Sequence, residues 1–155
     1  MTQRPVWIAL AVAGTIATAF SGCNGGTKVP TLPTPGPTCS PPAGTQTALV
    51  YPAPNSTAIP DQFGQIVIGS APALPSSWNV VVTTAISPNG VGGGKLVAAA
   101  TPIPSPTATP GFAGAVYQSS SFGSANFPGE VVTVFLNDTA SNCTPSGPLG
   151  QFTTQ

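Results

Sequence analysis

The fold of this protein is indicated first by the stretch WNVVVTTA at residues 78–85. Its apolar residues Trp78, Val80 and Val82 occupy every second position, so in an extended chain they lie on one face. The stretch QIVIGS at residues 65–70 alternates in the same way. This period of two predicts strands that each bury one face against a core.

Five further segments have a similar β-rich character, and turn residues separate them. The segment VVTVFL at 131–136 is apolar at nearly every position, which is typical of a strand covered on both faces. No segment after residue 46 shows the period of an amphipathic helix. The sequence therefore predicts an all-β domain at 47–155, a single seven-stranded β-sandwich. The predicted strands are 47–51, 65–70, 78–85, 95–100, 115–119, 131–137 and 151–154.

Three short motifs resemble immunoglobulin-like (Ig-like) domains of the fibronectin type III kind. The segment FPGEVVTV at 127–134 looks like the entry to strand F of those domains, although they usually carry a Tyr where Val132 stands. The segment YPAPNSTAIP at 51–60 resembles the opening of bacterial Ig-like domains, and GQFTT at 150–154 is similar to their closing strand. The resemblance implies an Ig-like β-sandwich with a modular, usually adhesive or architectural, role.

The charge composition narrows the possible partners. Charged residues make up only 4 % of the chain, against about 25 % in a typical soluble domain, while hydrophobic residues make up 41 %. The chain can therefore bury a core and does not fit the charge-rich kind of disorder. Its only cations are Arg4, Lys28 and Lys95. Since nucleic-acid-binding proteins set clustered Lys and Arg against phosphates, no nucleic-acid partner is expected.

The N-terminal segment has the pattern of an export signal. Arg4 precedes the uncharged segment VWIALAVAGTIATAF at 6–20, which has the length of a signal-peptide core and is short for a membrane span. The residues FSGC at 20–23 resemble the lipobox of bacterial lipoproteins, with Phe where Leu is usual. The resemblance implies a signal peptide at 1–22 and contact with a membrane through lipid on Cys23.

Two alternatives to the lipoprotein stay open. Cleavage by an ordinary signal peptidase after Ala19 would release a soluble secreted protein, and an uncleaved segment would remain as an anchor. The cysteines favour the lipoprotein, because lipid on Cys23 leaves an even pair, Cys39 and Cys143, for an oxidising compartment. The expected location is the cell envelope, where the exported protein is lipid-anchored to a membrane.

Residues 23–46 form the predicted lipid anchor and Pro-rich linker. Six prolines between residues 30 and 42 remove backbone donors and fix φ, so neither a helix nor a central strand fits. We interpret this segment as a polyproline-like stalk that acts as a spacer. A second Pro-rich segment, TPIPSPTATP at 101–110, is expected to be a long loop at the linker end of the domain, or a Pro-guarded edge.

The two remaining cysteines are predicted to form a disulfide. In the Ig-like strand order, Cys39 lies just before the first strand and Cys143 lies in the loop before the last one, at the same end of the sandwich. That placement allows the separation of roughly 4.4–6.8 Å between Cα atoms that a disulfide needs. A metal site or a catalytic thiol is the alternative, but neither cysteine has a neighbouring His, and two ligands do not make a zinc site. No metal and no cofactor are expected.

Enzyme chemistry has little support, and we expect that the protein is not an enzyme. The chain has no histidine, which removes the Ser-His and Cys-His arrangements. Glu130 and Asp138 lie roughly 26 Å apart along one predicted strand, whereas glycosidase carboxylates lie about 5–9.5 Å apart. A Ser–Lys pair that uses Lys95 stays open, and an enzyme would need a pocket that gathers Asp61, Glu130 and Lys95.

Three aromatic residues bear on carbohydrate binding. Trp78, Tyr51 and Tyr117 could form a platform on which sugars stack. Because Trp78 is in phase with Val80 and Val82, we expect it in the core instead.

The Ig-like order also predicts which loops lie away from the linker, namely 52–64, 86–94 and 120–129. The first hypothesis is therefore an Ig-like binding or adhesion module that meets a protein or a glycan through these distal loops. The alternative is a passive structural envelope component without a ligand of its own. An exposed apolar patch on the distal loops would favour the first hypothesis.

Overall fold

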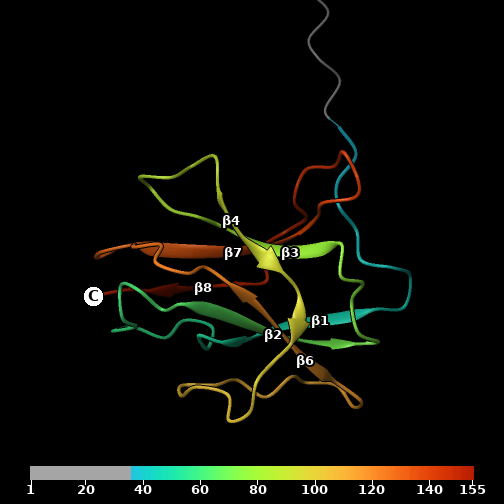
Figure 1. Cartoon of the computed structure of the whole chain (residues 1–155), viewed down its shortest axis with the longest axis horizontal. Coiled ribbons are helices and arrows are strands. Elements are labelled where there is room, and N and C mark those ends of the chain that lie inside the picture. Colours follow the sequence, from blue (N-terminus) through green and yellow to red (C-terminus); the bar gives the residue numbers. More distant parts are fainter. Residues whose placement is uncertain (1–35) are drawn as a thin grey trace, which may run out of the picture. The chain divides into compact units, whose positions relative to one another are not determined.

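The computed structural model describes residues 36–155, so the predicted signal peptide, Cys23 and the first part of the linker lie outside the described residues. The described residues form two antiparallel four-stranded sheets that face each other as a β-sandwich (Figure 1), and they contain no helix. The sheet orders are β1-β2-β6-β5 and β4-β3-β7-β8. The strands are β1 (Gln46–Tyr51), β2 (Gln65–Ala71), β3 (Trp78–Thr83), β4 (Val91–Lys95), β5 (Val97–Ala98), β6 (Val116–Ser121), β7 (Val131–Asp138) and β8 (Gly150–Thr153).

The all-β prediction is confirmed, but the prediction of seven strands is wrong because the domain has eight. The additional strand, β4, has the sequence VGGGK, and all of it except Lys95 lies in the predicted loop 86–94. Three consecutive glycines carry no side chains that could show an alternation, so the pattern misses this strand. After pairing with β3, the chain passes through the buried Leu96 into β5 of the other sheet.

The core lies between the two sheets. Trp78, Val80 and Val82 of β3 are buried on the inner face, as their alternation predicts. Ile66 and Ile68 of β2 belong to the same buried cluster. Because both sheets turn one apolar face inward, each hides the other from water, which is the main source of stability in a sandwich.

Strand β7 differs from its prediction. Val132, Val134 and Leu136 are buried, but Val131 at the start of the strand is 52 % exposed and Phe135 is half-buried. The expectation that both faces of this segment are covered is therefore wrong. Valine and phenylalanine favour an extended chain on either face of a sheet. An apolar run therefore identifies the strand, but it does not show which face of the strand packs against the core.

The two sheets come close together where β4 passes β6. The Ser120 hydroxyl donates a hydrogen bond to the Gly94 carbonyl (2.6 Å) and accepts one from the Val80 N–H (3.4 Å), so one side chain joins the sheets. A Cβ atom on Gly93 would lie 2.7 Å from a ring carbon of Phe122 and would also collide with Ser120. A glycine at position 93 is needed for this close approach.

Gly93→Ala is therefore expected to lower the free energy of unfolding by about 2 kcal/mol, within the usual range for overpacking. Urea unfolding followed by tryptophan fluorescence would measure the change. Gly147→Ala is the matched control, because no atom lies within 4 Å of the position of its Cβ. An unchanged midpoint for Gly93→Ala would contradict the close packing of β4 on β6.

The Pro-rich segment 101–110 was expected at the linker end of the domain, and this expectation is wrong. The segment folds over the outer face of the β1-β2-β6-β5 sheet. There Ile103 packs against an apolar cluster on the outer face, and the Ala108 N–H donates to the Val50 carbonyl (2.7 Å). Gly69 makes room for Pro110, since a Cβ on Gly69 would lie 2.5 Å from the proline ring. The cluster that the loop covers consists of Val50, Tyr51 and Val67. Covering this apolar surface explains the position of the loop.

A buried glutamine holds the loop between β2 and β3. The Gln118 carbonyl oxygen accepts hydrogen bonds from the Ser70 hydroxyl and the Leu74 N–H, both at 2.8 Å. The Gln118 amide nitrogen donates to the Leu74 carbonyl at 2.9 Å. Both polar groups of the Leu74 backbone are thus satisfied inside the sandwich, which fixes the path of the loop.

Candidate functional site

The strand registers place the connecting loops at two ends of the domain. Gln46 pairs with Ala71, and Trp78 pairs with Asp138, so the start of β1 and the loops 72–77 and 139–149 lie at one end, which we call the entry end. The loops 52–64, 84–90 and 122–130 lie at the opposite end, which we call the far end. These three loops correspond closely to the predicted distal loops.

The disulfide predicted between Cys39 and Cys143 is present at the entry end, with a Cα–Cα distance of 5.1 Å. Two backbone hydrogen bonds accompany it: the Cys39 N–H donates to the Thr144 carbonyl (2.7 Å), and the Thr144 N–H donates to the Pro37 carbonyl (2.9 Å). Cys39 is only 2 % exposed and belongs to the core cluster. The linker is therefore fixed to the sandwich at Cys39, seven residues before β1 begins.

A tight turn connects β7 to Cys143. The Asp138 carboxylate accepts hydrogen bonds from the Ser141 hydroxyl (2.6 Å) and the Ala140 N–H (3.1 Å). These two bonds, the Ser141 bond first, lower the pKa of Asp138. The stabilisation that they give is therefore present above the ordinary pKa of an Asp and is lost as pH falls through the lowered pKa.

An open cavity of about 290 Å³ lies beside the disulfide. Trp78, which is only 4 % exposed, forms part of its wall together with Asp138 and Ser141. The other lining residues are Pro37, Thr38, Cys39, Ser40 and Cys143. No sequence pattern indicates this cavity, because it forms only where the linker residues cross the end of the sandwich.

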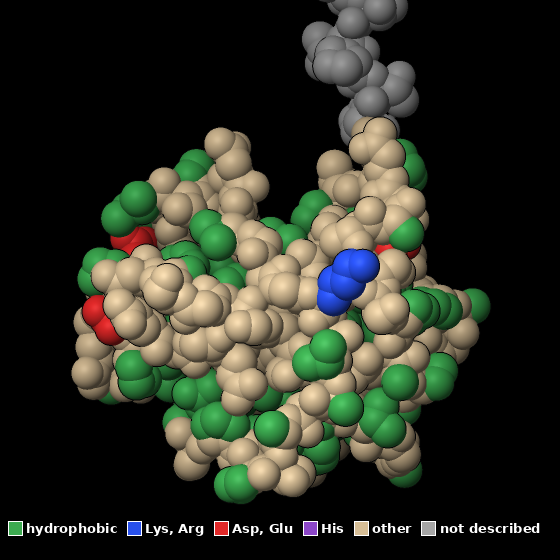
Figure 2. Space-filling view, viewed as in Figure 1, with side chains coloured by type: hydrophobic (Ala, Val, Ile, Leu, Met, Phe, Trp, Pro, Cys, Tyr) green, Lys and Arg blue, Asp and Glu red, His purple; other side chains and the backbone are tan. Residues whose placement is uncertain are grey.

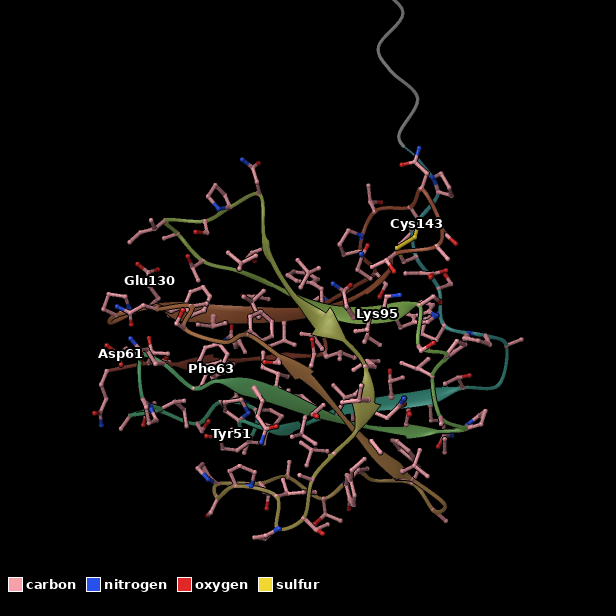
Figure 3. The ribbon with its side chains drawn as sticks, viewed as in Figure 1. Tyr51, Asp61, Phe63, Lys95, Glu130 and Cys143 are labelled. Atoms are coloured by element: carbon pink, nitrogen blue, oxygen red, sulfur yellow. A yellow bond between two sulfur atoms is a disulfide. The ribbon has the colours of Figure 1, made fainter. Side chains whose placement is uncertain are left out.

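Asp61, Glu130 and Lys95, which the enzyme alternative would gather in one pocket, do not lie together. Figure 3 shows Asp61 and Glu130 at the far end, whereas Lys95 lies toward the entry end, near Cys143. Lys95 is the register partner of Asn79, next to the Trp78–Asp138 pair at the start of β3. Among residues 36–155, no group of three or more His, Cys, Asp or Glu side chains is arranged to hold a metal ion.

The predicted alternative of a sugar-stacking platform is not formed. Trp78 is buried in the core, and Tyr51 is buried beneath the Pro-rich loop. Only Tyr117 of the three is exposed, at 39 %. The phenylalanines of the far-end loops are also inside, where Phe63 stacks on Phe127 with ring centroids 5.3 Å apart.

Two large apolar side chains are exposed at the far end. Ile86 in the β3–β4 loop is 75 % exposed, and Val131 at the start of β7 is 52 % exposed. The face of the domain in Figure 2 is otherwise mostly backbone and side chains that are neither apolar nor charged, with apolar groups distributed over it. Its one positive patch belongs to Lys95, the only Lys or Arg among the described residues.

Comparison with protein-family models, with curated proteins and with solved structures gives no match for this chain. Within the part of the chain that the structure describes, no helix is long and apolar enough to cross a membrane.

Proposed function

We propose that this chain is an exported bacterial lipoprotein that presents an Ig-like binding or adhesion module from the cell envelope. The lipid is carried on Cys23, and residues 24–38 separate it from the domain. A protein or a glycan is bound through the far-end loops. The alternative function is a passive envelope component, and it is favoured by the surface in Figure 2, which carries few charged side chains.

The strand order supports the Ig-like part of this proposal. Ig-like sandwiches carry strands A, B, E and D in one sheet and C, F and G in the other, with an additional strand beside C in some of them. The orders β1-β2-β6-β5 and β4-β3-β7-β8 follow this arrangement when β4 is the additional strand. Residues 127–134, which resemble the entry to strand F, lead into β7, which has the place of strand F.

The segment that follows β1 contacts the other sheet. After β1, residues 55–59 cross to the free edge of β8, where the Thr153 N–H donates to the Ser56 carbonyl (2.9 Å). The Ile59 N–H in turn donates to the Thr153 carbonyl (3.2 Å), and Ile59 forms a parallel bridge with Thr154. This pairing covers an edge that would otherwise attract other strands.

The single observation that carries the binding function is the exposed Ile86 at the end of the domain opposite the chain's entry. A large apolar side chain that is three-quarters exposed contributes little to folding, and it gains on the order of 1–2 kcal/mol when a partner buries the exposed part. A lipid-anchored domain would hold this end away from the membrane. The position of Ile86 therefore fits contact with a partner better than it fits a passive surface.

The test begins with the full-length protein produced in a bacterium and recovered from membranes. We expect its intact mass to show loss of residues 1–22 and a lipid adduct on Cys23. Beads that carry this lipidated protein in a bilayer are then mixed with envelope fragments of the bacterium that makes it. A soluble species that begins at Phe20 would overturn the lipid anchor.

The matched variants separate binding from the passive alternative. Ile86→Ser combined with Val131→Thr is expected to reduce retention of the fragments about tenfold, since two exposed apolar contacts are lost. Val97→Thr is the control, because Val97 is 59 % exposed but lies on the edge strand β5. No retention, or equal retention by all variants, would favour the passive component.

A further inference from the structure

The disulfide has a mechanical consequence that depends on how the chain continues from it into the sheets. Tension on the N-terminal tether reaches the domain at Cys39, where the disulfide and the backbone pairing of Thr38 with Thr144 form a junction. From this junction two routes lead inward. One continues along the chain to β1, and the other crosses the disulfide to Cys143 and β7.

The route to β1 is slack. It consists of the six residues 40–45, most of which are exposed, and its one backbone turn bond runs from the Thr45 N–H to the Pro42 carbonyl (3.0 Å). β1 itself is an edge strand of its sheet and pairs only with β2. Apart from one bond, from the Ala108 N–H to the Val50 carbonyl, a load on β1 therefore meets backbone hydrogen bonds only on the side that faces β2.

The route to β7 is short and tightly bonded. Between Asp138 and Cys143 the chain is held by the two side-chain bonds to the Asp138 carboxylate. In addition, Thr139 donates to the Ser77 carbonyl from both its N–H (2.9 Å) and its hydroxyl (2.6 Å). β7 lies inside its sheet and pairs with β3 on one side and with β8 on the other.

We infer that the Cys39–Cys143 disulfide makes this domain a load-bearing module, which transfers tension on the N-terminal tether to the inner strand β7 and keeps it off the edge strand β1. A short bonded path becomes taut before a longer exposed one, so the route through Cys143 takes the load first. Moving β7 requires two strand ladders to break, one on each side, whereas moving β1 requires one ladder and the single Ala108–Val50 bond to break.

The load-bearing role rests on the proposed attachment of the chain through its N-terminal side. It adds to that proposal a way in which the domain withstands tension when a partner is held at the far end. Between the tether and a partner held at the far-end loops, the force runs along the strands. The mechanical path is a property of the folded domain, so it can be measured whether or not Cys23 carries lipid.

Optical tweezers on the mature chain beginning at residue 23 would test this inference. Cys23 is the only cysteine outside the disulfide, so in unlipidated protein its thiol accepts one handle at the place where the tether pulls. The second handle is an azide-bearing residue at the exposed position 89 in the far-end loop 84–90. In a comparison molecule, the first handle is attached instead at the exposed position 43, which lies between Cys39 and β1.

Both molecules have the same covalent ring, and they differ only in where the load enters. At equal force, we expect the molecule pulled from position 43 to unfold at least about tenfold faster, which corresponds to 1.4 kcal/mol of barrier. Adding reductant should bring the molecule pulled from Cys23 to a similarly fast rate. Equal rates for the two handle positions, or no effect of the reductant, would overturn the inference. Neither outcome bears on the lipid anchor, which the intact mass tests separately.

Discussion

Replacing both Cys39 and Cys143 by serine is expected to lower the free energy of unfolding by about 4 kcal/mol. The disulfide closes a loop with a sequence separation of 104 residues, and opening a loop of this size returns about that much chain entropy to the unfolded state. Since small domains are stable by only about 5–15 kcal/mol, the loss would be a large part of the total. Urea unfolding of the mature chain with Cys23→Ser, in the wild type and in the variant, would measure it.

The control for this prediction is the wild-type protein under a reductant. It should show nearly the same midpoint as the serine variant, because both lack the cross-link and keep the remaining residues. A loss below about 1 kcal/mol would mean that the two backbone bonds between residues 37–39 and Thr144 hold the junction without the disulfide.

Phe152→Ala is expected to cost about 3–5 kcal/mol of unfolding free energy, the usual range for truncating a buried phenylalanine. Phe152 is 1 % exposed and meets Phe63 edge to face, with ring centroids 5.2 Å apart. Phe63 in turn contacts Phe122 and Phe127, so the substitution would leave a cavity within a group of four rings. Thermal unfolding followed by circular dichroism would report a lower midpoint.

The neighbouring residue supplies the control for this substitution. Gln151 in the same strand β8 is exposed, so Gln151→Ala should change the free energy by less than about 0.5 kcal/mol. If the two variants had similar midpoints, Phe152 would not be the core residue that its burial indicates. Phe152 lies toward the far end and Cys39 at the entry end, so the effects of the two largest changes should add.

These two expected losses have different origins, and this difference bears on function. The phenylalanine acts through packing in the folded state, whereas the disulfide acts mainly on the unfolded chain. A disulfide at the point where the chain enters also determines where an external force is applied. Stability in solution and resistance to tension can therefore be altered separately in this domain, for example by moving the point of attachment without changing the sequence of the core.

The sequence by itself determined the all-β class and the inner face of β3. The alternation of Trp78, Val80 and Val82 requires only a local extended chain and one buried face, so no knowledge of distant residues was needed. The pairing of Cys39 with Cys143 was also predicted, because the assumed strand order brings their segments to one end. The grouping of the three far-end loops followed from the same order.

Only the tertiary structure decided the features that depend on contacts between distant segments. β4 is a strand because it pairs with β3, and Gly93 lets it pass close to β6. The outer face of β7 stays exposed because the opposite sheet covers one side alone. The Pro-rich loop lies over β1 and β2 because Val50, Tyr51 and Val67 face outward there, after a register shift between Leu49 and Tyr51. A bulge, a close approach and a covered face each arise from the meeting of two segments, and no pattern within one segment records them.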